Sequence, residues 1–530
     1  MSGTTEDETV DGAFANRIDD LSLAEKVGQL FQVGFHGTEP TESIRELIAD
    51  YHVGGVIYFA RNVETASQTA ALSAALQDHA TETSGIPLLI AADQEGGTST
   101  RVPFGAVPPS NMALGATGSE SLAREFGEAV GRQISALGIN FDLAPVLDVN
   151  NNPDNPVIGP RSFGADPALV SDFGAAVTEG LQSAGIAACG KHFPGHGDTA
   201  VDSHEAMPVI DHGRDRLDRV ELRPFRAAID AGIDAVMSSH VFFPEIVADD
   251  DIPATLSEPV LTGLLRDELG YDGLVATDCL EMNAISDGVG TAEGAVQAVA
   301  AGADIVYVSH TPERQRAAVE AVVDAVRAGD IPEDQIDDSA ERVLRLKDRV
   351  VAPSETPSVD AALEGVEAMS ARVAPEAVTL VRDDADRIPV AEDADLFVWD
   401  FPAQRRSEAA EAVAYVDALV DHLSDSGYTV RRHSFADGER DLPAVENEVV
   451  LVCARNAANG ADQRAVVEQA EAAGHRVVTL AMTNPYDARA LPDARTLLTT
   501  YDDSPSMLEA AGDVITGQID ARGDLPVELD

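Results

Sequence analysis

The chain of 530 residues is too long for one ordinary hydrophobic core, and its hydrophobic content of 44% is normal for a globular protein, so we expect at least two domains. Its 92 acidic residues against 36 basic ones give a formal net charge of −56, which excludes nucleic acids and anionic membranes as partners because both would be repelled. No apolar run is long enough to span a membrane, and the three cysteines, Cys189, Cys279 and Cys453, are too widely spaced for a disulfide framework or a zinc knuckle.

Short runs rich in Val, Ile, Ala and Phe alternate with longer helix-like segments up to about residue 345. Eight such runs occur, at 28–35, 53–59, 87–93, 140–149, 186–193, 233–240, 273–278 and 303–310. Several are apolar on both faces, as buried parallel strands are. Eight β-then-α units predict a (β/α)8 barrel of the TIM type. A Rossmann-like sheet is the competing fold, but no GxGxxG motif follows an early strand.

A second series of strands and helices begins near residue 376. Its strands are expected at 377–381, 395–400, 429–435, 448–454, 475–482 and 494–501. The segment before it contains Pro and Ser and then becomes helical, which indicates a linker. The expected fold is therefore α/β, with a (β/α)8 barrel over 1–349, a linker over 350–375 and a smaller layered α/β domain over 376–530.

The acidic residues are spread along the chain, and its apolar content opposes disorder. Such a charge fits a protein from a halophile, because concentrated salt screens the self-repulsion of the compact state. Only three lysines occur, Lys26, Lys191 and Lys347, so nearly all positive charge is arginine. The N-terminal segment resembles no secretion signal, and we expect a cytoplasmic protein.

Polar residues occupy the carboxyl ends of five predicted barrel strands, where the chemistry of this fold is placed. They are Asp93, Asp148, Lys191 with His192, His240 and Asp278. A single aspartate at a strand end often only caps the next helix. Several polar groups at one mouth of the barrel favour a site.

The stretch GKHFPGHGDTAVDSH, residues 190–204, contains three histidines. Pro194 and the glycines preclude the helix that would align His192 with His196, which disfavours a zinc site. Asp202 and His204 are two residues apart, so a bend lets the carboxylate hold one ring nitrogen while the other faces a substrate. A proton-transfer pair is the favoured hypothesis, and an Asx-turn beside a passive histidine is the alternative.

Four stretches together resemble one known family: GKHFPGHGDTAVDSH, ADQEGG at 92–97, NPVIGPRSFGADP at 155–167 and ATDCLEM at 276–282. They are similar to the N-acetyl-β-glucosaminidase (β-N-acetylhexosaminidase) branch of glycoside hydrolase family three. The opening LSLAEKVGQLF also resembles that family, and AVTLV, NPYD and GDLPVEL resemble its C-terminal α/β domain. The resemblance therefore covers nearly the whole chain.

The resemblance implies that Asp278 is the nucleophile of a retaining glycosidase and forms a covalent glycosyl-enzyme. His204 would be the general acid/base, oriented by Asp202; most retaining families use a second carboxylate in this role. The substrate-binding residues it implies are Asp93, Arg101, Arg161, Lys191 and His192. We expect a carbohydrate substrate and neither a metal nor an organic cofactor.

The expected activity is removal of terminal β-linked N-acetylglucosamine. Because a neutral imidazole does not repel an anion, phosphate can replace water in the second step, so an N-acetylglucosaminide phosphorylase is one alternative. A β-glucosidase with the same site and an inactive carbohydrate-binding relative are two others. His240 is either a pocket residue or a structural one, and Cys279 is expected to pack behind the barrel wall.

Overall fold

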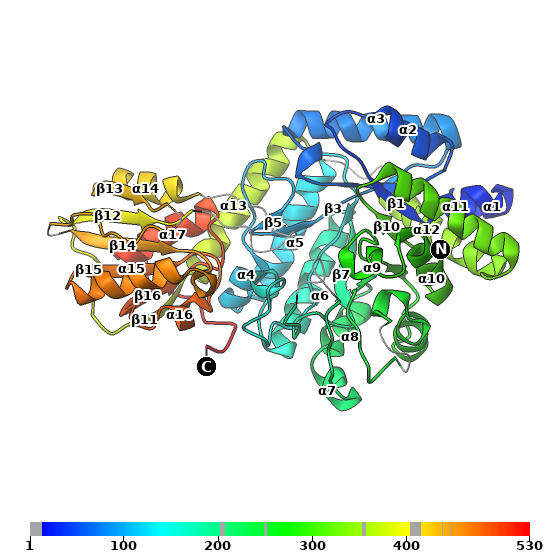
Figure 1. Ribbon diagram of the computed structural model, residues 1–530. Helices are drawn as coiled ribbons and strands as arrows, with labels where there is room; N and C mark the ends of the chain where they lie inside the picture. The colour runs from blue at the N-terminus through cyan, green and yellow to red at the C-terminus, as the bar shows by residue number, and fades with distance from the viewer. Residues whose placement is uncertain are drawn as a thin grey trace, which may run out of the picture.

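The computed structural model describes residues 13–201, 207–247, 252–351, 357–402, 415–436, 438–446 and 448–529. Two α/β units lie side by side, and helix α13 (Val359–Ala377) lies between them (Figure 1). None of the described helices is both long enough and apolar enough to cross a membrane.

Eight parallel strands form the first sheet, in the order β10-β1-β2-β3-β6-β7-β8-β9. Their bounds are β1 (Phe31–Gly34), β2 (Gly55–Tyr58), β3 (Leu89–Ala92), β6 (Phe141–Asp142), β7 (Ala187–Phe193), β8 (Ala235–Ser238), β9 (Leu274–Ala276) and β10 (Val306–Val308). A parallel bridge between Ala276 and Ile305 joins β9 to β10 and closes the barrel. The predicted barrel is confirmed, and each strand lies within its predicted run.

Helices surround the barrel on its outer side (Figure 1). They are α1 (Leu23–Gln29), α2 (Glu42–Ala49), α3 (Ala66–Ser84), α4 (Asn111–Thr117), α5 (Glu120–Ser135), α6 (Pro167–Ser183), α7 (Arg214–Arg219), α8 (Leu222–Asp230), the π-helical η5 (Pro259–Glu268), α9 (Asn283–Ser286), α10 (Thr291–Ala301), α11 (Pro312–Ala328) and α12 (Glu333–Val350). The ends of several helices follow from the local sequence. Ser22 and Glu25 form a capping box at the start of α1, and Gly85, at φ +67°, ends α3.

The second sheet has six strands in the order β11-β16-β15-β14-β12-β13, with β11 antiparallel to β16 and the other pairs parallel. Its strands are β11 (Thr379–Asp383), β12 (Asp395–Asp400), β13 (Thr429–Ser434), β14 (Val449–Ala454), β15 (Arg476–Ala481) and β16 (Thr496–Thr499), and its helices are α14 (Val416–Asp425), α15 (Ala461–Ala472), α16 (Asp487–Ala490) and α17 (Pro505–Thr516). The predicted smaller α/β domain is confirmed; the boundaries at 349/350 and 375/376 stay predictions.

Alternate residues of the second sheet belong to two different cores. Leu396 and Val398 of β12 pack in the cluster that includes α14 and α17, while Phe397 and Trp399 pack in the cluster that includes α15. Because successive strand residues point to opposite faces, both faces of the sheet are covered by helices. The first of these clusters continues through α13 into the barrel helices.

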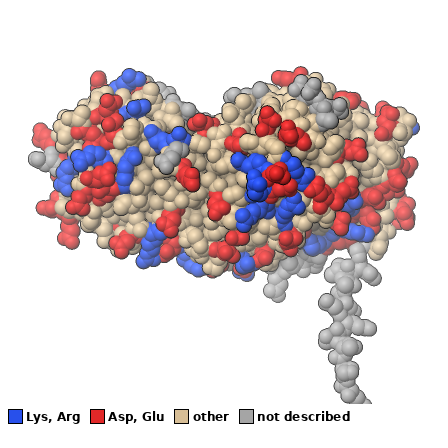
Figure 2. Space-filling model, turned by 90° about the horizontal axis from the view of Figure 1, so that it is seen from below, with Lys and Arg blue, Asp and Glu red and all other residues tan. Residues whose placement is uncertain are grey.

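All three lysines of the chain are buried, with exposed fractions of 8% for Lys26, 2% for Lys191 and 0% for Lys347. The exposed basic side chains are therefore essentially all arginines. Figure 2 shows acidic groups over both units, with basic groups gathered in patches among them. The halophilic origin suggested by the net charge stays a prediction.

Lys347 of α12 is buried without an acidic partner among the described residues; its Nζ donates to Gln29 Oε1 at 2.6 Å. Burial lowers its pKa to about 7. The pKa of a lysine is about 10.4 in an unfolded chain. Between about pH 7 and 10 the Lys347 amine is therefore protonated in the unfolded state and neutral in the folded state. The free energy of unfolding consequently rises with pH across that window.

We expect Lys347→Met to stabilise the protein at pH 7 by on the order of 2 kcal/mol, since the cost of burying the amine exceeds the lost hydrogen bond. The gain should shrink as the pH approaches 10. Thermal unfolding followed at several pH values measures it. Arg345→Met, on the same helix with a side chain 67% exposed, is the matched control and should give no gain. A loss of stability at pH 7 would contradict the prediction.

Candidate active site

A short hairpin at the carboxyl end of β3 brings polar residues to the mouth of the barrel. Asp93 follows β3 directly, and β4 (Gln94–Gly96) then pairs with the antiparallel β5 (Ser99–Thr100). The turn depends on Gly97, at φ +54°, because a Cβ there would lie only 2.8 Å from Ser110 Cβ. The sequence reasoning did not identify this hairpin.

Five charged side chains meet at this mouth, and we call them the strand-end ion cluster: Asp93, Glu95, Arg101, Arg161 and Lys191. Lys191 Nζ lies 2.6 Å from Asp93 Oδ1 and 2.7 Å from Glu95 Oε1. Arg161 donates from Nε and Nη2 to the two oxygens of Glu95, both at 2.7 Å. Arg101 Nε lies 3.8 Å from Asp93 Oδ2. The cluster therefore contains three cations and two carboxylates.

The charges of the cluster are held in place by one another. Burial alone would raise the pKa of Glu95, but Arg161 and Lys191 outweigh it and hold that pKa well below its usual range. Burial disfavours the Lys191 ammonium, yet Asp93 and Glu95 raise its pKa above the usual value. Glu95, Arg161 and Lys191 therefore all stay ionised at neutral pH.

Asp148 organises the loop after β7. It is fully buried and accepts hydrogen bonds from His192 Nδ1 at 2.7 Å, from the His192 amide at 3.2 Å and from the His196 amide at 2.6 Å. Burial opposes its ionisation, but His192 and His196 outweigh that effect and lower its pKa. Since the carboxylate only accepts, Nδ1 of His192 carries a proton and the ring orientation is fixed.

Asp278 follows β9 and is partly exposed, with Oδ1 accepting from the Cys279 amide at 2.7 Å. His240, fully buried after β8, donates from Nε2 to the Cys279 carbonyl at 2.9 Å, so it supports the loop that carries Asp278. Burial raises the pKa of the Cys279 thiol to about 11, which leaves it protonated at neutral pH.

Tyr307 of β10 is buried near two of the predicted site residues, Asp93 and Asp278. Burial raises the pKa of its hydroxyl well above the usual value, and the nearby charges of Asp93 and Asp278 add to the rise. Asp93 and Asp278 are therefore both close enough to Tyr307 for their charges to act on its hydroxyl. Glu281 does not take part, because its oxygens accept from the amides of His310 and Thr311 ahead of α11.

The structure brings four of the eight predicted site residues into direct contact in the strand-end ion cluster: Asp93, Arg101, Arg161 and Lys191. His192 follows Lys191 in β7, and Asp278 follows β9. Asp202 and His204 lie outside the described residues. Glu95 was missed, although it is 2% exposed and binds both Arg161 and Lys191. The signal was its spacing of two from Asp93, which places both side chains on one face of an extended strand.

Among the described residues, Asp198, His212 and Glu221 form the group whose atoms approach closely enough to hold a metal ion. Arg216 forms ion pairs with Asp198 at 3.8 Å and with Glu221 at 3.2 Å, so the protein supplies its own cation there. Neither His192 nor His196 belongs to this group.

Comparisons with known proteins identify the family of the chain. Residues 22–346 match the Glycosyl hydrolase family 3 N terminal domain. A beta-hexosaminidase A from Pseudoalteromonas piscicida is 34% identical over 71% of this chain and 66% of its own length, and a "Beta-N-acetylglucosaminidase/beta-glucosidase" from Cellulomonas fimi is 32% identical over 95% and 93%. The structure of a family 3 beta-N-acetylglucosaminidase from Paenibacillus sp. str. FPU-7 has 44% identity and a TM-score of 0.89, covering 96% of this chain and 99% of that one. The chain therefore belongs to glycosyl hydrolase family 3.

Proposed function

We propose that the protein is a retaining glycosidase that removes terminal β-linked N-acetylglucosamine. The observation that carries the proposal is the strand-end ion cluster, which lies at the carboxyl ends of the barrel strands, where Asp278 follows β9. Relatives whose names include β-N-acetylglucosaminidase or β-hexosaminidase activity support the substrate. The substrate is a carbohydrate, and the cytoplasmic location expected from the sequence stays a prediction.

In this proposal the cluster grips the sugar. An ammonium has three N–H donors, and Lys191 directs two of them to Asp93 and Glu95. The third is left for a sugar hydroxyl, while Asp93, which is more exposed than Glu95, accepts from another. Glu95 stays behind Lys191 and Arg161 as a positioning residue. His192, held by Asp148, contacts the sugar from the next strand position.

Asp278 then attacks the anomeric carbon as the glycosidic bond breaks, and His204 donates a proton to the leaving oxygen. The new bond joins the sugar to a carboxylate oxygen of Asp278. In the second step His204 takes a proton from water, and the hydroxyl oxygen displaces Asp278. Two displacements on opposite faces retain the configuration. Asp202 orients the His204 ring throughout.

The test is release of product from an aryl N-acetyl-β-glucosaminide and an aryl β-glucoside, side by side in molar KCl, with and without phosphate. We expect the N-acetyl substrate to be preferred by at least about 10-fold in kcat/KM, which corresponds to about 1.4 kcal/mol of transition-state binding. The rate should not depend on phosphate, and N-acetylglucosamine should be the product.

Three results would contradict the proposal. Phosphate-dependent release of a sugar 1-phosphate would make the protein a phosphorylase. Preference for the glucoside would make it a β-glucosidase. Binding of N-acetylglucosamine without turnover of either substrate would make it an inactive relative.

A further inference from the structure

Arg161 lies on an irregular part of the barrel that the second domain contacts at several points. We call residues 155–165 the Arg161 segment; it contains the short 3-10 helix η3 (Gly159–Arg161) and is otherwise without regular structure. Such a segment has few backbone hydrogen bonds of its own to fix its place. The position of the Arg161 guanidinium, which binds Glu95, therefore depends on the groups that surround the segment.

Tyr486 of the second domain holds the segment through Asn150. It lies in the loop between β15 and α16 and is 4% exposed. Its hydroxyl donates to the Asn150 carbonyl at 3.1 Å and accepts from Asn150 Nδ2 at 3.3 Å. Asn150, which is fully buried, accepts from the Gly159 amide at 3.1 Å and donates from its own amide to the Gly164 carbonyl at 2.9 Å. One phenol is thus connected to the segment on both sides of Arg161.

A second contact reaches the backbone of Arg161 itself. Asn111, at the start of α4, donates from Nδ2 to the Arg161 carbonyl at 2.6 Å. The preceding residue, Ser110, caps α4 with its hydroxyl and donates from its amide to Asp502 Oδ2 at 2.6 Å. Asp502 belongs to the second domain, so the second domain fixes the residue next to the one that binds the Arg161 carbonyl.

The C-terminal part of the second domain contacts the far end of the segment. The Ala165 amide donates to the Pro526 carbonyl at 2.9 Å. Gly164 has no room for a side chain, because a Cβ there would lie 2.4 Å from the same carbonyl oxygen. The two parts of the chain therefore pack backbone against backbone at this point.

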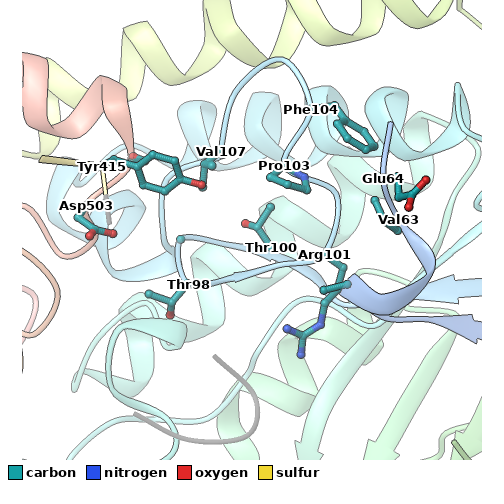
Figure 3. A pocket seen from close by; sticks show the side chains of 13 residues that line it. Val63, Glu64, Thr98, Thr100, Arg101, Pro103, Phe104, Val107, Tyr415 and Asp503 are labelled. Carbon is teal, nitrogen blue, oxygen red and sulfur yellow. The ribbon is translucent and has the colours of Figure 1, made fainter. Parts of the chain in front are cut away.

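The loop after β16 also packs on the β4–β5 hairpin, which carries Glu95. A Cβ at Gly97, in the turn of the hairpin, would lie 3.4 Å from Asp502 Cβ. Figure 3 shows Asp503 of this loop and Thr98 of the hairpin on the walls of one cavity of about 200 Å³. The second domain therefore contacts the segments that carry both members of the buried ion pair.

We propose that the second domain is a positioning element for sugar binding, in which Tyr486 and Asp502 hold the segment where Arg161 can bind the sugar. The inference rests on the proposed function, in which Arg161 belongs to the cluster that grips the sugar. Tyr486 and Asp502 act through Arg161 and do not touch the substrate. Their loss should therefore weaken sugar binding and leave the chemistry at Asp278 unchanged.

The test is Tyr486→Phe, which keeps the ring and removes only the hydroxyl. The carbonyl and the amide group of Asn150 then lose this partner while they stay buried, so the segment is held less firmly. We expect KM for the aryl N-acetyl-β-glucosaminide to rise about 5-fold, the scale of one net hydrogen bond. The kcat should stay within about twofold of wild type, because the lost binding is shared by the ground state and the transition state.

Tyr58→Phe is the matched control. The Tyr58 hydroxyl is also fully buried, and it is hydrogen-bonded to Ser73 Oγ of α3 at 3.2 Å. Its removal should lower the unfolding temperature by a similar amount and leave KM unchanged. An equal rise in KM in both variants, or a loss of kcat alone in Tyr486→Phe, would overturn the inference.

A second measurement does not depend on turnover. In hydrogen–deuterium exchange followed by mass spectrometry, the amides of residues 155–165 should exchange about 5-fold faster in Tyr486→Phe than in wild type, since local opening is governed by the contacts that hold a segment. Tyr58→Phe should leave them unchanged. Unchanged exchange of this segment in Tyr486→Phe would overturn the inference.

A double variant shows whether Tyr486 acts through Arg161. Arg161→Lys keeps a charge beside Glu95 but lacks the planar fork that binds both carboxylate oxygens. Adding Tyr486→Phe to it should change KM by less than about twofold, because the arrangement that Tyr486 maintains is already lost. A rise of about 5-fold in both backgrounds would overturn the inference. A wild-type protein that hydrolyses neither aryl substrate would overturn the proposed function instead, and the exchange data would still decide whether the second domain holds the segment.

Discussion

Asp278→Ala is expected to lower kcat/KM by about 10⁴-fold or more while the protein stays folded, because losing the nucleophile removes the covalent step that divides the reaction in two. The side chain is partly exposed, so its truncation opens no cavity in the core and the unfolding temperature should hardly change. Steady-state rates on the aryl N-acetyl-β-glucosaminide and thermal unfolding measure both effects. Activity within 100-fold of wild type would refute the assignment.

Rescue by azide distinguishes the loss of a nucleophile from the loss of an acid/base residue, because the two variants give glycosyl azides of opposite configuration. If Asp278 is the nucleophile, azide should restore turnover of the Asp278→Ala variant on an activated substrate and give the α-glycosyl azide, since a single displacement inverts the configuration. A β-glycosyl azide would mean that another residue still forms the covalent intermediate. Glu281→Gln is the matched control, because Glu281 is near the same strand end and caps the His310 and Thr311 amides; it should lose stability rather than chemistry.

The barrel could be predicted because its strands are short apolar runs buried on both faces, and that pattern survives in the sequence without knowledge of any contact. Strand β6 is much shorter than its run, at Phe141–Asp142. The run contains Pro145, which has no N–H to donate to a sheet. The β4–β5 hairpin was not predicted, because its strands carry polar residues whose burial depends on Ser110 and Asp502 packing around Gly97.

The positions of Lys191 and Asp278 at strand ends could be predicted from the sequence, because both are polar residues at the end of an apolar run; their roles stay predictions. Glu95 was missed because its importance lies in two partners, Lys191 and Arg161, that are far from it in the chain. The contact of Ser110 with Asp502 joins residues 392 positions apart. No local pattern carries such information, so the contact between the barrel and the second domain could only come from the structure.

Lys191→Met is expected to destabilise the protein by about 3 kcal/mol and to abolish most of the activity. Removing one member of a buried ion pair leaves an uncompensated charge, which costs several kcal/mol. Glu95 keeps both hydrogen bonds to Arg161, whereas Asp93 is left with Arg101 at 3.8 Å. Asp93 is therefore the carboxylate that loses its close cationic partner. Thermal unfolding and kcat/KM on the aryl substrate are the two measurements.

The double variant Lys191→Met/Asp93→Asn separates stability from function. Asp93→Asn removes the carboxylate that lost its close partner, so we expect most of the lost stability to return, while activity stays low because both groups proposed to grip the sugar are gone. Lys191→Arg tests whether the shape of the cation matters as well as its charge. The longer planar guanidinium keeps the charge but does not fit a site built for a compact ammonium, so we expect its activity to be little higher than that of Lys191→Met. Full activity of Lys191→Arg would mean that only the charge matters, and a double variant as unstable as Lys191→Met would mean that Asp93 is not the carboxylate that Lys191 compensates.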